Sequence, residues 1–258
     1  MRLPLGLIVV ALAACTSPPP ICAKGQEPQD IRLPPDPIAG YHIYGHAHND
    51  YEHAHPLFDA LDHHFYSVEA DIWFDNGRLS VSHDGPPYVG TLEALYLEPL
   101  ASLADANGGS VYGNGVGFRL VIDIKDNQAA LPGALHDLLA RYPIVGGAVT
   151  VVATGNAAMK RAFVDVSPQL GVRDSNNFTT KDPPADGKWT DYALDWTAYV
   201  ADDHQLGCLV DDAHAVGRKL RPWNTDDDRA TWRAELAAGV DYINTDDLAG
   251  LDAFLDAP

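Results

Sequence analysis

Four histidines, one aspartate and one glutamate stand within eleven residues near the start of the chain. The stretch is GHAHNDYEHAH, from Gly45 to His55. Imidazole and carboxylate groups bind metal ions and transfer protons near neutral pH. The stretch therefore predicts a metal site, a pair of acid–base catalysts or a solvated histidine-rich loop, and residues elsewhere in the chain must decide between them.

Two hydrophobic segments further along carry charged residues at alternate positions. In SVEADIW, Glu69 and Asp71 share one face of the predicted strand, and FRLVIDIK repeats this arrangement with Asp123 and Lys125. Because successive side chains of a strand point to opposite sides, three carboxylates are expected to face one interior. Buried carboxylates favour a bound cation, and oxygen ligands favour Mg²⁺ or Ca²⁺. The alternative is a structural ion-pair network in which Lys125 and Arg119 neutralise the acids.

Two histidines end predicted strands that flank the acidic strand. His46 closes the segment 41–46, and His83 closes the segment 79–83. In a barrel of parallel strands, catalytic side chains occupy the carboxyl ends of the strands. The two histidines are therefore expected to act as a general acid and a general base.

These side chains must be positioned by the elements that follow Tyr41, where short apolar segments alternate with helix-like stretches. The predicted strands are 41–46, 66–73, 79–83, 118–125, 148–154, 170–174, 218–224 and 241–245. Alternation of strands and helices predicts a parallel α/β sheet, and eight strands predict a (β/α)8 TIM barrel. An open doubly wound sheet is the structural competitor, but no glycine-rich phosphate loop follows the first strand.

The composition is that of one acidic domain. The chain has 258 residues, of which 36 are acidic and 17 basic, and its formal charge is −19. Such a surface repels nucleic acids and anionic membranes, so no nucleic-acid partner is expected. An anionic substrate would need a local cation that reverses the field. We expect a monomer.

The first 40 residues are predicted to be a leader and not part of the barrel. The sequence MRLPLGLIVVALAAC predicts a signal peptide over 1–14, with a lipobox-like LAAC at 12–15. Residues 15–40 are rich in Pro and predict a tether to a barrel over 41–258. An ordinary cleavage before Lys24 is the alternative to lipidation.

Either form of processing predicts export, as a cell-envelope lipoprotein or as a secreted or periplasmic protein. The membrane would then be reached only through an N-terminal lipid anchor. Export would permit a disulfide between Cys22 and Cys208. Because Cys22 lies in the Pro-rich leader, one leader thiol and one buried thiol are favoured over a disulfide.

The order of these motifs resembles the phosphatidylinositol-phospholipase-C-like phosphodiesterase superfamily, which includes bacterial glycerophosphodiester phosphodiesterases and spider sphingomyelinases D. The motifs are GH at 45–46, ExD at 69–71, HD at 83–84, DIK at 123–125, WN at 223–224 and the closing GVDYINTD. HNDYEHAHPLFDAL, SVEADIW and TLEALYLEPL resemble more narrowly its altered-inheritance-of-mitochondria branch. The resemblance covers about residues 41 to 250.

The resemblance implies a phosphoric diester hydrolase with one Mg²⁺ or Ca²⁺, acting on a small phosphodiester or a phospholipid headgroup. It implies metal ligands Glu69, Asp71 and Asp123, catalytic residues His46, His83 and Lys125, and substrate-binding residues Asn49 and Trp223.

The sequence departs from the glycerophosphodiesterase pattern at three places. Ala47 and His48 follow His46, where that family has Arg and Gly; GPPYVGTL follows His83-Asp84; and Asp123 stands where Glu is usual. These departures put specificity for a glycerol headgroup in doubt.

Two other functions remain open from the sequence. His46-x-His48 also resembles the metal-binding pair of amidohydrolase-type and histidinol-phosphatase-type barrels, which hydrolyse substrates with a histidine-bound transition metal. The strands near 148–154 and 170–174 offer no further histidine for such a site. A surface-binding lipoprotein without catalysis is the second alternative, and the intact ExD, HD and DIK motifs argue against it.

Overall fold

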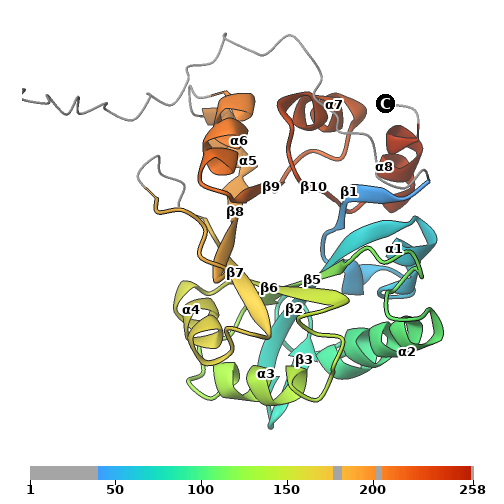
Figure 1. Ribbon diagram of the computed structural model, residues 1–258, viewed down its shortest axis with the longest axis vertical. Coiled ribbons are helices and arrows are strands. Elements are labelled where there is room, and N and C mark those ends of the chain that lie inside the picture. Colours follow the sequence, from blue (N-terminus) through green and yellow to red (C-terminus); the bar gives the residue numbers. More distant parts are fainter. Residues whose placement is uncertain (1–39, 177–181, 202–204, 257–258) are drawn as a thin grey trace, which may run out of the picture.

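The computed structural model describes residues 40–176, 182–201 and 205–256. In these ranges, eight parallel strands follow one another in the hydrogen-bonded order β10-β1-β2-β5-β6-β7-β8-β9, with the helices outside them (Figure 1). The strands are β1 His42–Ala47, β2 Phe65–Asp75, β5 Phe118–Ile124, β6 Val149–Gly155, β7 Gly171–Ser175, β8 Trp189–Asp195, β9 Lys219–Trp223 and β10 Ile243–Thr245. The predicted (β/α)8 barrel is confirmed.

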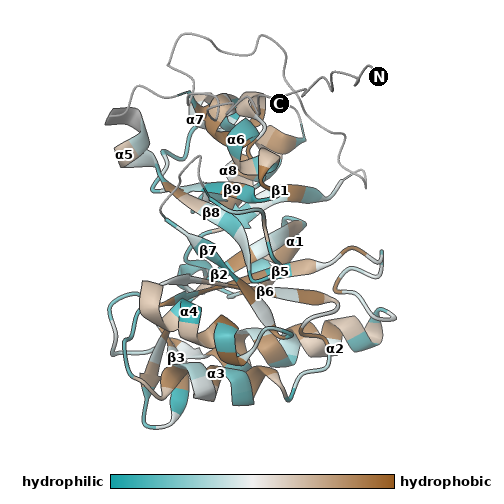
Figure 2. Cartoon of the chain, turned by 60° about the vertical axis from the view of Figure 1, so that its left-hand side comes forward, coloured by the Kyte–Doolittle hydropathy of each residue, from teal (hydrophilic) through white to brown (hydrophobic). Residues whose placement is uncertain are grey.

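Within the described residues, every parallel strand except β7 is followed by a helix. The helices are α1 Phe58–Asp62, α2 Glu98–Ala106, α3 Leu131–Leu139, α4 Ala157–Val166, α5 Trp196–Ala201, α6 Leu206–Ala215, α7 Arg229–Ala238 and α8 Leu248–Leu255, with a 3-10 turn Asp50–Glu52 and a π-helix Glu93–Leu97. Hydrophobic and hydrophilic stretches alternate along these helices (Figure 2). None of the helices in the described ranges has the length and apolar character to span a bilayer.

Local sequence sets the ends of the helices. The Asp228 carboxylate accepts hydrogen bonds from the backbone N–H groups of Ala230 and Thr231, at 2.8 and 2.9 Å, and so caps the start of α7. Gly239 ends the same helix with φ of 81°, a left-handed conformation that favours glycine. These two residues bring the chain from β9 back to β10 beside it.

The apolar faces of β2 and β5 hold the barrel against its helices. Val68, Ala70 and Ile72 on β2 are fully buried in the main core, together with Leu120 and Ile122 on β5. Fully burying a Val, Leu or Ile side chain stabilises the fold by about 1.5–3 kcal/mol. Because this face points outward to the helices, the alternate charged residues of both strands must point into the barrel.

The predicted strand 79–83 is wrong as a barrel strand. Residues 78–81 form β3 (Arg78–Val81), which pairs antiparallel with β2, and β4 (Gly90–Thr91) extends the hairpin. Asn76 and Gly77 form the turn with φ of 48° and 78°. A two-residue turn of this kind joins only antiparallel strands. His83 therefore follows a hairpin.

The eighth barrel strand is β8, which the sequence pattern did not predict. Its segment WTDYALD carries two aspartates, and Asp residues are depleted in strands. The buried Asp191 is neutralised across the barrel by Arg119 at 3.0 Å. Arg119 therefore pairs with β8 and not with the acids of β2, which removes one cation from the predicted ion-pair network.

Cys208, on α6, is buried and disulfide-bonded. The preference for a free buried thiol is therefore wrong. Cys15 and Cys22, the predicted signal peptide and lipobox, and all of the tether up to residue 39 lie outside the described residues.

Glu235 on α7 is fully buried, and neither carboxylate oxygen has a hydrogen-bond partner in the part of the chain described. Burial, and secondarily the charge of Asp227, raises its pKa well above the ordinary value. An unfolded Glu ionises near its ordinary pKa of 4.5, whereas the folded one resists ionisation, so the fold loses stability as pH rises above that value. Glu235→Met is expected to raise the free energy of unfolding, with a larger gain at pH 8 than at pH 5. Denaturant unfolding at both pH values measures this.

The matched control for this change is Glu98→Met, on the exposed side of α2. That variant should change the unfolding free energy little, and by the same amount at both pH values. An equal effect of pH on the two variants would contradict the burial argument.

Candidate active site

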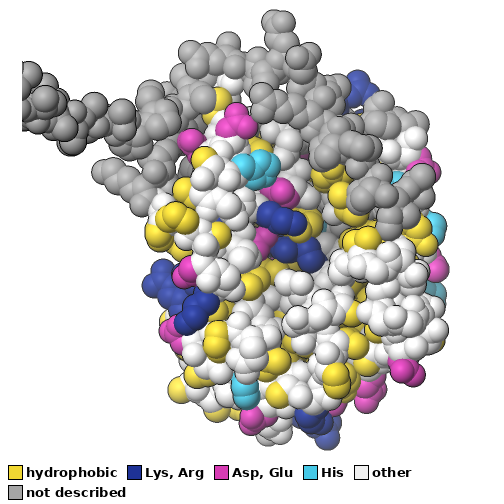
Figure 3. Space-filling view, in the orientation of Figure 1, with side chains coloured by type: hydrophobic (Ala, Val, Ile, Leu, Met, Phe, Trp, Pro, Cys, Tyr) yellow, Lys and Arg dark blue, Asp and Glu magenta, His cyan; other side chains and the backbone are white. Residues whose placement is uncertain are grey.

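Three carboxylates converge inside the barrel from β2 and β5. The strand register pairs Asp71 with Asp123, and Glu69 lies one inward-facing position earlier on β2. One ligand oxygen from each of the three lies within 4.8 Å of the other two. Basic side chains gather in a hollow on one face of the molecule, with acidic side chains and a histidine beside them (Figure 3). The predicted meeting of Glu69, Asp71 and Asp123 is thus observed.

Lys125 bridges two of the three acids. Its Nζ atom lies 2.8 Å from Asp123 Oδ2 and 3.0 Å from Asp71 Oδ2. The other oxygen of each, Oδ1, is buried without a hydrogen-bond partner, as is Glu69 Oε2. Unpaired buried carboxylate oxygens are costly. Lys125 therefore pairs with one oxygen of each aspartate. One oxygen on each of the three acids remains without a hydrogen-bond partner among the described residues.

The pKa values of the two aspartates also show a shortage of positive charge in the cluster. Burial, and then the negative charges of Asp123 and Glu69, raises the pKa of Asp71 to about 7. Burial and Glu69 also raise the pKa of Asp123. Burial opposes the charge on Lys125, yet Asp123 and Asp71 raise its pKa. One ammonium between Asp71 and Asp123 thus leaves this pair of aspartates one positive charge short, a deficit that a dication would remove.

Glu69 differs from the two aspartates because Arg221 lies near it. Burial disfavours its ionised form, but Arg221 and His46 outweigh this effect and lower its pKa. Arg221 NH1 is 3.8 Å from Glu69 Oε2 and 2.9 Å from Asn244 Oδ1, which fixes the guanidinium between β9 and β10. Glu69 is therefore held as a carboxylate in the barrel interior.

The first strand places His46 and His48 at different depths. His46 is opposite Ser67 in the register, and its Nδ1 lies 2.7 Å from Ser67 Oγ. It is fully buried, and burial lowers its pKa to about 4. His48, which follows the last residue of β1, lines the cavity, and its Nε2 lies 3.8 Å from Glu69 Oε2. Burial thus places His48, and not His46, at the surface of the cavity, and the catalytic role of His46 stays a prediction.

His48 has the arrangement of an oriented acid–base catalyst. Its Nδ1 lies 2.8 Å from Asp246 Oδ1, and its Nε2 lies 3.8 Å from Glu69 Oε2. Burial opposes its protonation, but the hydrogen bond to Asp246 and the charge of Glu69 raise its pKa. A carboxylate on one ring nitrogen leaves the other nitrogen directed at the cavity.

The cavity at this end of the barrel has a volume of about 370 Å³. His83 lines this cavity although it does not end a barrel strand, because the loop after the hairpin brings it back over the barrel mouth. The His83 Nδ1 atom lies 2.9 Å from Asp84 Oδ1. The lining residues are His48, Glu69, His83, Asp123, Lys125, Thr154, Gly155, Asn176, Ala193, Arg221, Trp223 and Asn224. Two imidazoles, two cations and two of the three acids thus share one space.

Asn49 supports the site from behind and is absent from the cavity lining. It has φ of 42°, and its Oδ1 lies 3.0 Å from the Tyr51 hydroxyl, which lies 2.8 Å from Asp71 Oδ2. Trp223 does line the cavity, and its indole Nε1 has no hydrogen-bond partner among the described residues. Of the two residues predicted to contact substrate, Trp223 lines the cavity and Asn49 does not.

The sequence missed a polar wall formed by β6 and β7. Thr154 Oγ1 donates to Asp174 Oδ2 at 2.7 Å, while Lys160 Nζ donates to Asp174 Oδ1 and Asn176 Oδ1 at 2.6 and 3.1 Å. The buried Lys160 therefore fixes Asn176 directly, and Thr154 through Asp174, from outside the cavity. The alternating polar residues of β6 and β7 could have predicted the wall. The contact with Lys160 could not be predicted, because Lys160 lies on α4 and only the fold brings it to these strands.

Gly155 ends β6 against the Asp123 carboxylate. A side chain at this position would collide with Asp123 Oδ1 and with the backbone of Ile124, and its φ is 77°. Gly155→Ala is therefore expected to displace Asp123 and to lower phosphodiester turnover by about 10²-fold, comparable to the loss of one electrostatic contact. Steady-state kinetics with excess Mg²⁺ measures this.

Gly187→Ala is the matched control for Gly155→Ala, since Gly187 has φ of 78° and no neighbour within 4 Å of an added Cβ. It carries the same backbone strain without the collision. Equal losses of activity in the two variants would show that strain, and not displacement of Asp123, is responsible.

Two family models match the chain at the regions that build this site. An AIM6-like phosphodiesterase domain matches residues 40–114, which include β1 and β2. The glycerophosphoryl diester phosphodiesterase family matches residues 219–249, which include β9 and β10. Both regions supply side chains to the cavity.

The curated relatives are yeast proteins named altered inheritance of mitochondria protein 6. One from Kluyveromyces lactis is 30% identical over 51% of this chain and 42% of its own length. One from Saccharomyces cerevisiae is 26% identical over 79% of this chain and 68% of its own length. The chain thus spans less than half of the first relative.

Solved structures share the fold at low identity. A glycerophosphodiester phosphodiesterase from Parabacteroides distasonis has a TM-score of 0.59 and 13% identity, covering 82% of this chain and 96% of that one. A calcium-dependent phosphoinositol-specific phospholipase C from Pseudomonas sp. has a TM-score of 0.53 and 13% identity, covering 80% and 90%. At such identities the likeness concerns the barrel alone.

The barrel, its acidic centre and the two matched regions together resemble a phosphodiesterase-type TIM barrel. Two regions of the chain are similar to phosphodiesterase families, and its barrel has the fold of the solved glycerophosphodiester phosphodiesterases and phosphoinositol-specific phospholipase C. The N-terminal part of the barrel is similar to the AIM6-like phosphodiesterase domain.

The predicted export to the cell envelope is contradicted by these relatives. Their name refers to the inheritance of mitochondria, which lie inside the cell. The prediction came from the apolar N-terminal stretch, and that stretch lies outside the described residues. The envelope localisation is therefore not retained.

Proposed function

We propose that this protein is a metal-dependent phosphodiester hydrolase that acts on a small glycerophosphodiester-type molecule or a phospholipid headgroup. The observation that carries the proposal is the cluster of Glu69, Asp71 and Asp123 beside the cavity, in which each acid has one buried oxygen without a hydrogen-bond partner among the described residues. Three convergent acceptors with an unbalanced negative charge are what a hard dication requires.

The residues present fit one Mg²⁺ or Ca²⁺. Glu69, Asp71 and Asp123 would hold it through oxygen atoms only, which both ions prefer. The calcium dependence in the name of the Pseudomonas phospholipase C supports a calcium ion in a barrel of this type. When bound, the dication would neutralise charge that develops on the phosphate oxygens.

The cations of the chain suit an anionic phosphodiester. Lys125 and Arg221 both line the cavity, and Arg221 supplies a guanidinium although no Arg follows His46. A guanidinium forms paired hydrogen bonds with phosphate oxygens. The Trp223 indole, whose N–H has no hydrogen-bond partner in the described part of the chain, would orient the alcohol part of the substrate.

Proton transfer falls to His48 and His83, the two histidines that line the cavity. One would take the proton of the attacking hydroxyl, and the other would protonate the leaving alcohol. Asp246 orients His48, and the buried His46 positions Glu69 from 3.6 Å. The proposal thus transfers the catalytic role predicted for His46 to His48.

Metal removal tests the proposed function. After EDTA treatment, release of p-nitrophenol from bis(p-nitrophenyl) phosphate, and of alcohol from glycerophosphodiesters, is expected to fall to background. Added Mg²⁺ or Ca²⁺ should restore it. Activity that survives chelation would contradict the proposal, and a panel of glycerophosphodiesters and phospholipids would identify the headgroup.

The same experiment separates the alternative built on His46 and His48. A histidine-bound transition metal would make Zn²⁺, and not Mg²⁺ or Ca²⁺, restore activity. The geometry favours the oxygen set, because the ligand groups within 4.8 Å in the described ranges contain neither histidine. A protein that binds phosphodiesters and never releases product would be the non-catalytic alternative.

A further inference from the structure

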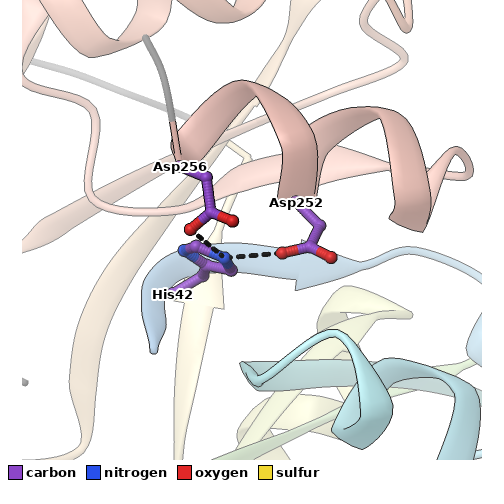
Figure 4. Close-up of side chains that lie close together, drawn as sticks. All are labelled: His42, Asp252 and Asp256. Carbon is purple, nitrogen blue, oxygen red and sulfur yellow. Dashed lines mark hydrogen bonds and ion pairs between the residues drawn. The ribbon is translucent and has the colours of Figure 1, made fainter. Parts of the chain in front are cut away.

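A second cluster of metal-binding side chains lies at the end of β1 opposite the cavity. His42 begins β1, whereas His48 follows its other end. His42 faces Asp252 and Asp256, which lie one turn apart along α8 and at its end (Figure 4). In the described residues, this is the other group whose ligand atoms all lie within 4.8 Å of one another.

The distances in this cluster suit a tetrahedral ion. His42 Nε2 lies 2.7 Å from Asp252 Oδ1 and 3.8 Å from Asp256 Oδ1. Ligand atoms at zinc bond lengths of about 2.0–2.1 Å are separated by about 3.3 Å in a tetrahedron. The two distances lie on either side of this value. The His42 side chain is 3% exposed and the Asp256 side chain is 67% exposed, so the carboxylate can move to a fixed imidazole.

The cluster has more acceptors than donors. A neutral imidazole has one N–H, which Asp252 takes, and the buried His42 Nδ1 has no partner. In the described part of the chain, neither Asp252 nor Asp256 has a Lys or Arg ion-pair partner. The two carboxylates at this buried imidazole therefore retain acceptor capacity for a further cation.

A second histidine holds Asp252 from its other side. His63, which follows α1, places Nδ1 2.7 Å from Asp252 Oδ2. A ligating carboxylate is commonly fixed by such an outer hydrogen bond. Asp252 is thus oriented with one oxygen toward His63 and the other toward His42 and Asp256.

We propose that His42, Asp252 and Asp256 form a structural site for a transition-metal dication of the zinc class. A mixed nitrogen and oxygen ligand set favours zinc over Mg²⁺ and Ca²⁺, which prefer oxygen alone. The ion would join the first strand to the last helix across 210 residues of sequence. It would stabilise the closed barrel, and it does not depend on the proposed hydrolase activity.

Titration of the full chain with Zn²⁺ tests this site. An Asp71→Asn background removes binding at the cavity, and the metal-free protein is followed by calorimetry and thermal unfolding. We expect one zinc ion per chain and a rise of Tm by about 5–10 °C at a hundredfold excess over Kd. Asp256→Asn, at an exposed position, should weaken zinc binding at least tenfold without unfolding the protein.

His214→Gln is the matched control, because His214 pairs with Asp241 at 2.8 Å but belongs to neither group of ligand atoms within 4.8 Å of one another in the described residues. It should bind zinc as the parent does. Co²⁺ should give visible absorption typical of tetrahedral nitrogen and oxygen ligands, which His42→Gln abolishes. Unchanged zinc binding in Asp256→Asn, an equal Tm rise with Mg²⁺, or no zinc binding at all would overturn the proposal.

Discussion

The Asp71→Asn variant is expected to lose phosphodiester turnover by about 10²–10³-fold, the usual cost of removing one electrostatic contact to the transition state. Asp71 offers an unpartnered Oδ1 to the proposed ion, and its Oδ2 receives both Lys125 and Tyr51. An amide in its place removes the ligand charge and keeps the shape. The loss should appear in kcat/KM for bis(p-nitrophenyl) phosphate, and a higher Mg²⁺ concentration should recover part of it.

Asp75→Asn is the matched control for Asp71→Asn. Asp75 is the same residue type on the same strand, and its carboxylate bonds only to Asn76 among the contacts of the described chain. This variant should keep its activity. If Asp71→Asn is folded, as shown by an unchanged Tm, and stays within tenfold of the parent, Asp71 is not a metal ligand.

The His48→Gln variant is expected to lose about 10²–10⁴-fold in turnover, the usual contribution of a general acid or base. His48 lines the cavity and is oriented by Asp246, whereas His46 is sealed beneath it. His46→Gln should therefore lower turnover less than His48→Gln does. Its main effect should be weaker metal binding, because His46 lies beside Glu69. Kinetics at saturating metal separates the two effects.

His136→Gln is the control for His46→Gln. His136 lies on α3, away from the cavity, and its Nδ1 also lies within hydrogen-bond distance of a serine hydroxyl, 2.9 Å from Ser167 Oγ. It should leave turnover unchanged. A full loss in His46→Gln at saturating metal, together with retained turnover in His48→Gln, would return the catalytic role to His46.

The barrel could be predicted from the sequence because its strands alternate apolar and polar residues. β2 and β5 have this pattern clearly, and their inward carboxylates meet as expected. Two elements were assigned wrongly. The Asn76-Gly77 turn was a readable hairpin signal, whereas β8 was hidden because Asp191 is neutralised by Arg119, 72 residues earlier.

The candidate site could be predicted by residue type but not by depth. Alternation places His46 and His48 on the same face, and only burial and the cavity lining show which one reaches the cavity. Arg221 and the wall held by Lys160 depend on contacts between distant segments, which no local pattern specifies. Lys125 was predicted to face the site, and its ion pairs with Asp71 and Asp123 are those of the alternative in which it neutralises the acids.

A crystal of the protein grown with Mn²⁺ in place of Mg²⁺ tests the central claim most directly, since the anomalous signal of Mn²⁺ locates the ion. The account predicts one peak within about 2.0–2.6 Å of oxygens from Glu69, Asp71 and Asp123, the range of Mg²⁺ and Ca²⁺ bonds. Lys125 would then turn from Asp71 Oδ2 toward the cavity. An empty cluster, with Lys125 still bridging the two aspartates at saturating metal, would contradict it.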